Sequence, residues 1–121
     1  MVEYLWQVDW DDNVIGKIER NECHEKKLIH RAIVVLVFNK KGYLWVNRRS
    51  TKKRIFSGCL DSSVAGHMQY GETPEICAQK ELKEELGIEE NLSFLFKIKT
   101  PDNIDNMIVS VFKCVTDKIQ K

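Results

Sequence analysis

"GETPEICAQKELKEELGI", residues 71–88, places five glutamates in eighteen positions and guides the interpretation of the rest of the chain. The stretch predicts a helix, because Thr73 can cap its N-terminus, Pro74 suits the first helical position and Gly87 suits the C-terminal cap. Apolar residues at four-residue spacing predict the side that packs on a sheet. These residues are Ala78, Leu82 and Leu86.

Three of the glutamates crowd one side of this predicted helix. With about 100° per residue, Glu85 lies about 40° to one side of Glu81 and Glu84 about 60° to the other. Like charges at this spacing repel by about 0.2–0.5 kcal/mol per pair, and a divalent cation would remove that penalty. Hard oxygen ligands favour Mg²⁺ or Mn²⁺. The helix alone leaves an alternative open, a solvated charged face that Lys80 and Lys83 partly neutralise.

The composition predicts a single domain over residues 1–121 with no general attraction to polyanions. The chain has 19 basic and 18 acidic residues, a net charge of +1, which argues against a nucleic-acid polymer or a membrane surface as partner. No apolar run approaches the roughly 20 residues that span a bilayer, and residues 1–12 lack the pattern of a signal peptide. Four scattered cysteines without a CxxC pair are interpreted as reduced thiols of a cytoplasmic protein.

Outside the helix, the sequence predicts strands separated by polar loops. Residues 30–38 are almost wholly apolar and rich in β-branched side chains, which predicts a strand buried on both faces. Residues 19–28 are polar and predict a connecting loop, and residues 49–61 predict a surface loop. Further strands are predicted at residues 4–8, 14–18, 43–48, 94–99 and 107–115. A strand-rich chain with one long helix indicates a mixed α+β sandwich.

From Gly66 the chain follows a spaced pattern of fixed residues. The pattern is Gly, five residues, Glu, seven residues, Lys-Glu-Leu, one residue, Glu-Glu, one residue and Gly-Ile. Over residues 66–88 it resembles the Nudix box, Gly-x5-Glu-x7-Arg-Glu-apolar-x-Glu-Glu-x-Gly-apolar. The one departure is Lys80, where the family has arginine. The resemblance implies a Nudix-type α/β/α sandwich with a mixed β-sheet.

The resemblance also implies an activity, the metal-assisted hydrolysis of a phosphoanhydride bond in a nucleoside di- or triphosphate or a related small diphosphate. Mg²⁺ or Mn²⁺ is the implied cofactor, with Glu81 and Glu85 as its principal ligands. Glu84 and the carbonyl oxygen of Gly66 are implied as further ligands, and Glu72 as part of the same acidic site. A metal draws charge from the diphosphate and lowers the pKa of a water, while a nearby carboxylate receives the proton.

Lys80 puts the strength of this activity in question. Lysine offers a point charge in place of the planar fork with which the family's arginine can orient glutamates. We therefore predict Glu84, Glu85 and Lys80 as catalytic residues, with a catalytically weak nucleotide-binding module as an alternative.

Beyond the box, residues 3–115 resemble the branch of the family that contains isopentenyl-diphosphate isomerases and their hydrolase relatives. The resemblance runs through "VDWDDNVIG", "RAIVVLVFNKKGYLWVNRRS" and "SSVAGHMQYGE". The isomerases bind a metal through histidines and acids and move protons on carbon with a cysteine and a glutamate. Ala65 stands at the cysteine position and Met107 at the glutamate position, with Asp105 near another expected acid. The hydrolase relatives are therefore favoured, and an isomerase-like enzyme is the alternative.

Three histidines, His24, His30 and His67, fall near the metal-binding histidines of the isomerases. His30 could instead hydrogen-bond a core group, and His24 is expected as an exposed loop residue. For the diphosphate we predict contacts from His67, Arg48 and Lys53, by charge-assisted hydrogen bonding. A solvated basic loop is the alternative for the two basic residues. The partner is then a small-molecule nucleotide or diphosphate. Oligomeric state is open, with a homodimer as one option.

Overall fold

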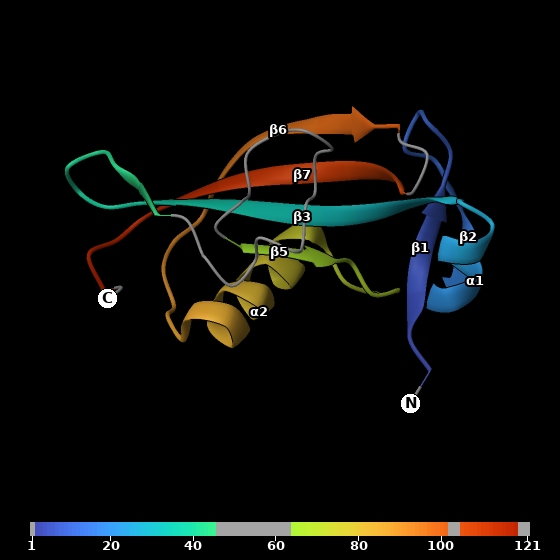
Figure 1. Cartoon of the computed structure of the whole chain (residues 1–121), viewed down its shortest axis with the longest axis horizontal. Coiled ribbons are helices and arrows are strands. Elements are labelled where there is room, and N and C mark those ends of the chain that lie inside the picture. The colour runs from blue at the N-terminus through green and yellow to red at the C-terminus, as the bar shows by residue number, and fades with distance from the viewer. Residues whose placement is uncertain (1, 46–63, 102–104, 119–121) are drawn as a thin grey trace.

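The computed structural model describes residues 2–45, 64–101 and 105–118, and the strands among them form one mixed sheet (Figure 1). In chain order the described strands are β1 (Tyr4–Val8), β2 (Val14–Glu19), β3 (Ile29–Phe38), β4 (Leu44–Trp45), β5 (Val64–His67), β6 (Ser93–Thr100) and β7 (Asn106–Val115). The sheet order is β2-β1-β3-β7-β6, and β4 and β5 each pair with β3. The β3–β7 pairing is parallel and the other pairings are antiparallel.

Strand β3 lies at the centre of the sheet and is buried on both faces, as its apolar sequence predicts. Ile33 and Val35 belong to one buried cluster, while Ala32 and Val34 belong to another. Successive side chains of a strand point to opposite faces, so the two clusters mark the two faces of the sheet. The four predicted strands that lie wholly within the described residues outside β3 are confirmed to within a residue at each end.

The box helix is α2 (Pro74–Leu86), and its predicted caps are confirmed. The Thr73 side chain accepts a hydrogen bond from the N–H of Ile76, and Gly87 adopts a left-handed conformation with φ 70°. Below β5 and β3 in Figure 1, α2 covers one face of the sheet, which we call the α2 face. The core beneath it contains Ile33, Val35, Val37, Val64, Met68, Cys77, Ala78, Leu82, Ile88, Phe112 and Cys114.

One prediction about the connections is wrong, and one strand was not predicted. Residues 19–28 were expected as a loop but contain α1 (Arg20–Glu25). The carboxylate of Glu19 caps this helix by accepting hydrogen bonds from the N–H groups of Asn21 and Glu22, and Cys23 anchors it in the interior. Strand β5 was not expected, although it carries Gly66 and His67. Only residues 44 and 45 of the predicted strand at 43–48 are described as strand, and the predicted loop at 49–61 lies outside the described residues.

The cysteine side chains that the structure describes agree with a reduced interior. Cys23, Cys77 and Cys114 are free thiols and are buried. Burial raises the pKa of the Cys23 thiol to about 11, so it stays protonated at neutral pH. Among the described residues, no helix is both long and apolar enough to cross a bilayer.

Candidate active site

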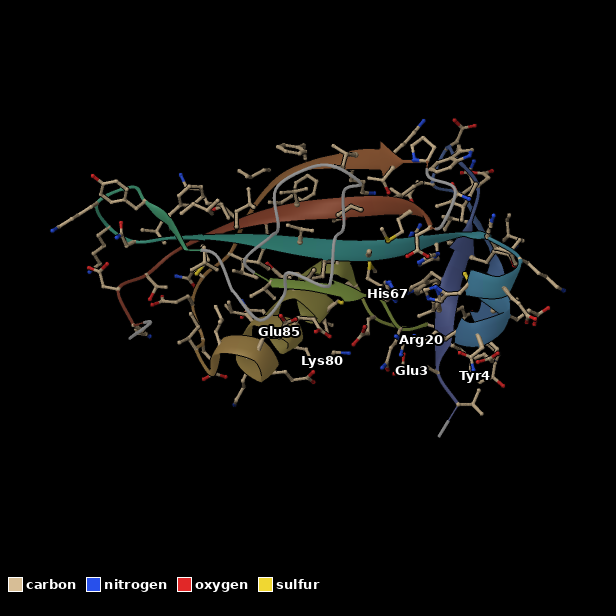
Figure 2. The ribbon with its side chains drawn as sticks, viewed as in Figure 1. Glu3, Tyr4, Arg20, His67, Lys80 and Glu85 are labelled. Atoms are coloured by element: carbon tan, nitrogen blue, oxygen red, sulfur yellow. The ribbon has the colours of Figure 1, made fainter. Side chains whose placement is uncertain are left out.

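The glutamates of α2 meet strand β5 at Gly66. A methyl group added to Gly66 would lie 2.5 Å from the Cδ atom of Glu81, so the carboxyl group of this glutamate occupies the space above the glycine. Glu81 and Glu85 are both half-buried, whereas Glu84 is exposed. Of the predicted ligands, Glu81 therefore lies directly against Gly66. Figure 2 labels Glu85 on α2 and His67 on β5 above it.

Among the box glutamates, Glu81 has a clearly raised pKa. Burial raises the pKa of this carboxyl to about 7, with further increases from a hydrogen bond to Glu85 and from the charges of Glu84 and Glu85. A carboxylic acid with this pKa holds a proton that a cation at the same place would displace. A raised pKa of this kind is typical of acid clusters at functional sites.

Lys80 on α2 forms an ion pair with Glu72, which lies in the loop that precedes this helix. Its Nζ lies 2.5 Å from Oε2 of Glu72, while Oε1 of Glu72 accepts a hydrogen bond from the N–H of Gln69 at 2.8 Å. The indole N–H of Trp6 donates to the carbonyl oxygen of Glu72 at 3.0 Å. Glu72 is therefore fixed as a loop anchor at the edge of the acidic site. Nothing in the sequence pattern indicated the contacts from Trp6 and Gln69.

The three histidines converge from three different elements. His24 lies on α1, His30 on β3 and His67 on β5, and their candidate ligand atoms all lie within 4.8 Å of one another. The prediction of His24 as an exposed loop residue is wrong, because it lies on a helix, is half-buried and contacts Asp105 at 3.1 Å. His30 is 1% exposed. The three-histidine group was expected only from the resemblance, since no single spacing in the sequence brings these residues together.

Hydrogen bonds leave two of these ring nitrogens available as ligands. The Leu28 carbonyl oxygen lies 3.1 Å from Nδ1 of His30 and can only accept, which assigns the proton to Nδ1. Asp105 does the same for Nδ1 of His24. Burial lowers the pKa of His30, so its ring is neutral. Nε2 of His24 and Nε2 of His30 are buried without a hydrogen-bond partner among the described residues. Two lone pairs thus point into a protected space, an arrangement that fits a metal ion.

Met107 and Ala65 lie beside the histidines on the face of the sheet opposite α2. Met107 pairs with His30 across β3 and β7, and Ala65 packs against the buried cluster of that face. We call this surface the histidine face. Neither residue offers a hard ligand or a proton-transfer group there.

The comparisons with known proteins agree with this geometry. The family model described as NUDIX domain matches residues 28–121. The chain belongs to the Nudix family. The predicted α+β fold with a mixed sheet is thereby confirmed, and with it the family to which the box was assigned. Nudix hydrolases as a family act on pyrophosphate bonds of small molecules and generally use divalent metals.

Relatives fall into the two groups that the sequence indicated. An uncharacterized Nudix hydrolase of Nostoc sp. is 45% identical over 92 residues, which is 75% of this chain and 54% of that protein. An isopentenyl-diphosphate Delta-isomerase of Serratia proteamaculans is 32% identical over 121 residues, 93% of this chain and 68% of that protein. The crystal structure of DR0079 from Deinococcus radiodurans matches with a TM-score of 0.72 and 29% identity, covering 95% of this Nudix chain and 72% of that chain. The chain thus spans between about half and two thirds of the length of these curated relatives.

Two predicted phosphate-binding residues, Arg48 and Lys53, lie outside the described residues. The third, His67, belongs to the histidine group. The acids and the histidines are linked through β5, because Gly66 and His67 are consecutive and point to opposite faces of the sheet. This Nudix fold therefore carries two candidate cation sites back to back.

Proposed function

We propose that this protein is a divalent-metal-dependent hydrolase that cleaves a phosphoanhydride bond in a nucleoside di- or triphosphate or a related small diphosphate. The observation that carries the proposal is the position of the Glu81 carboxyl group against Gly66, where burial and the neighbouring Glu85 raise its pKa. An acid cluster under this strain fits a cation and its phosphate ligand. The buried thiols support the cytoplasm as the proposed compartment.

Each candidate site residue has a role in this proposal. Glu81, Glu85, Glu84 and the Gly66 carbonyl would hold Mg²⁺ or Mn²⁺. When bound, the ion supplies positive charge against the diphosphate oxygens. Glu84 is exposed and is not held in the Gly66 contact, so it can accept the proton of an attacking water; Glu85 is the other candidate base. Lys80 positions Glu72 and with it the loop between β5 and α2. Arg48, Lys53 and His67 would contact the diphosphate.

The test is a screen of nucleoside di- and triphosphates, sugar nucleotides and dinucleotides for phosphate or pyrophosphate release with Mg²⁺ and with Mn²⁺. Glu85→Gln is the blank, because it removes a charge from the site while keeping the side-chain shape. Glu75→Gln is the matched control, since Glu75 is exposed on the first turn of the same helix. We expect one substrate class to be hydrolysed by the unaltered chain and by Glu75→Gln only. Equal release by Glu85→Gln would overturn the proposal.

A second candidate function is isomerisation of isopentenyl diphosphate, and the histidine group favours it. Its candidate ligand nitrogens lie within 4.8 Å of one another, close enough to share one metal ion, but Ala65 and Met107 supply no acid or base. We expect no conversion of isopentenyl diphosphate by the unaltered chain. The double variant Ala65→Cys with Met107→Glu restores both group types, so it is the sensitive form of this assay. Conversion by the unaltered chain would replace the hydrolase proposal with this one.

A further inference from the structure

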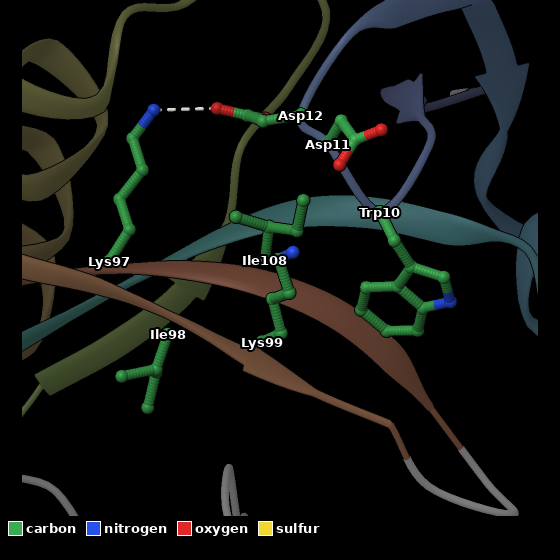
Figure 3. Close-up of a pocket in the computed structure, with 7 residues that line it drawn as sticks. All are labelled: Trp10, Asp11, Asp12, Lys97, Ile98, Lys99 and Ile108. Atoms are coloured by element: carbon green, nitrogen blue, oxygen red, sulfur yellow. Dashed lines mark hydrogen bonds and ion pairs between the residues drawn. The ribbon is translucent and has the colours of Figure 1, made fainter.

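A surface pocket lies on the α2 face of the sheet, away from the acids and the histidines. Figure 3 shows it between the β1–β2 turn, which carries Trp10, Asp11 and Asp12, and strand β6, which carries Lys97 and Lys99. Its volume is about 230 Å³. Ile108 of β7 is 3% exposed and forms the floor.

The sheet separates this pocket from the histidine group. His30 pairs with Met107, and the next pair along β3 and β7 is Arg31 with Ile108. Successive side chains alternate between faces, so Ile108 and the pocket lie on the face opposite the histidines. The pocket is therefore distinct from the candidate histidine site.

The pocket is also removed from the acids, although these lie on the same face. Gly66 pairs with Ile33, Ile33 with Ser110 and Ser110 with Lys97, so one row crosses β5, β3, β7 and β6. Three strand spacings of about 4.8 Å separate Gly66 from Lys97. A ligand confined to the pocket therefore does not reach the Glu81 carboxyl.

The walls of the pocket are fixed by an ion-pair network. Oδ1 of Asp12 accepts from Nε of Arg31 at 2.8 Å, and Oδ2 accepts from Nζ of Lys97 at 2.5 Å. The Asp12 carboxylate therefore connects the β1–β2 turn to β3 and to β6, although these segments are far apart in the sequence. The side chain of Asp12 is only 19% exposed, so its carboxylate is shielded from solvent, whereas Lys97 is 47% exposed. The pocket is therefore held open between two anchored walls.

The lining side chains outside this ion-pair network determine which ligand the pocket would bind. The indole of Trp10 is half-buried and offers a flat apolar surface beside the Ile108 floor. Lys99 has no ion pair with another described residue, so its ammonium can meet an anionic group. Asp11 is exposed on the opposite wall and repels negative charge there, so an anionic group is favoured only beside Lys99. These features select a flat ring with one negative charge.

Pocket size limits the ligand further. Sites that enclose drug-sized molecules have volumes of about 300–1,000 Å³, above the 230 Å³ found here. The volume of the pocket matches one ring with its substituent. We propose that this pocket is a second binding site, which takes a single planar aromatic ring carrying one anionic group.

Benzoate is the probe, added to the ¹⁵N-labelled full chain in the presence of EDTA so that metal-dependent binding is absent. NMR shifts of the Trp10 indole N–H and of the Lys97, Lys99 and Ile108 amides report on the pocket. Cyclohexanecarboxylate keeps the charge without the flat ring, and benzyl alcohol keeps the ring without the charge. We expect saturable shifts with benzoate and at least about threefold weaker binding of both comparison ligands. These ligand comparisons need no altered protein.

Variants then assign the two recognition elements. Trp10→Leu should weaken benzoate by about fivefold and remove its advantage over cyclohexanecarboxylate. Lys99→Met should remove its advantage over benzyl alcohol, while Lys83→Met on α2, an exposed lysine distant from the pocket, should change nothing. The absence of saturable shifts, or shifts equal in Trp10→Leu, Lys99→Met and the unaltered chain, would overturn the proposal. Glu85 does not line the pocket, so Glu85→Gln should bind benzoate as the unaltered chain does, and the failure of this test is distinguishable from the failure of the hydrolysis test.

Discussion

Among single residues, Gly66 has the most direct control over the acidic site. It lies on β5 so close to Glu81 that any larger residue must displace the carboxyl group. The displaced atoms are the far end of a flexible side chain, so the structural cost is small while the change in position is large. Only the shape of the site, and not the stability of the fold, should depend strongly on this glycine.

We therefore expect Gly66→Ala to lower kcat/KM by about 100-fold, because a displacement of about 1 Å at a catalytic group has effects of this size. The melting temperature should change little. Gly16→Ala is the control, since a methyl group there meets nothing within 4 Å. Both variants are compared in the hydrolysis assay and by thermal unfolding. Full activity in Gly66→Ala would show that the position of Glu81 is unimportant.

Lys80 shows how a lysine can stand in for the family's arginine. The structure gives it a single partner oxygen on Glu72, and the backbone N–H of Gln69 binds the other oxygen. Lys80→Met should lower the free energy of unfolding by about 1 kcal/mol, because the pair is partly buried. It should also lower kcat, since the loop between β5 and α2 loses its anchor. Lys83→Met is matched in chemistry, but its pair with Glu89 is exposed. Equal effects from the two variants would contradict the anchoring role.

At the scale of the elements, helix α2 makes the stability of the fold depend on pH, because it carries Glu81. The folded-state pKa of Glu81, about 7, lies above the ordinary value of 4.5, so the folded chain holds an extra proton between these two values. Stability of the metal-free protein therefore falls as the pH rises through this window. His30 acts in the opposite direction, because its lowered pKa reduces stability as the pH falls below 6.5. The two effects have to be separated by substitution.

The Glu81→Gln variant separates the effect of Glu81 from that of His30, because it removes the titrating carboxyl group and keeps the side-chain size. We expect its melting temperature in EDTA, relative to the unaltered chain, to be higher at about pH 8 than at about pH 5. Glu89→Gln is the control, an exposed glutamate in the segment after α2. A relative melting temperature that is constant over this range would show that Glu81 has an ordinary pKa.

The elements also show where sequence interpretation ends. The helix over residues 74–86 was predictable because Thr73, Pro74 and Gly87 mark both ends, and β3 because it is uniformly apolar. In contrast, α1 has six residues and is capped by Glu19, which is not among the preferred capping residues. Strand β5 has four residues and contains Gly66, so neither length nor propensity identifies it.

At the scale of the whole molecule, the acids were predictable as a group from their spacing, and the histidines only from the family resemblance. Glu81, Glu84 and Glu85 share one helix, so a helical period brings them together. The histidines come from α1, β3 and β5, and only the sheet topology unites them. The pocket at Trp10 depends on a contact between Asp12 and Lys97, which lie 85 residues apart in the chain. Contacts of this kind leave no local trace in the sequence.

The same topology makes the two candidate cation sites chemically different. On the α2 face the candidate ligands are carboxylate and carbonyl oxygens, which suit Mg²⁺ or Mn²⁺. On the histidine face they are imidazole nitrogens, which suit Zn²⁺. Burial keeps His30 neutral, so no proton has to be displaced from its ring. Strand β5 carries Gly66 and His67 on opposite faces, so a substitution can remove metal binding at one candidate site without altering the other.

His30→Gln should therefore weaken Zn²⁺ binding by at least about tenfold and leave the Mn²⁺ requirement of hydrolysis unchanged. Glu85→Gln should have the reverse effect, because it alters the acids and none of the imidazoles. Met107→Leu is the control on the histidine face, since it conserves volume beside His30 and supplies no ligand. Calorimetric titrations with each metal, together with the hydrolysis assay, make the comparison. If His30→Gln and Glu85→Gln weaken both metals equally, the two groups form one site, and the sheet does not separate their chemistry.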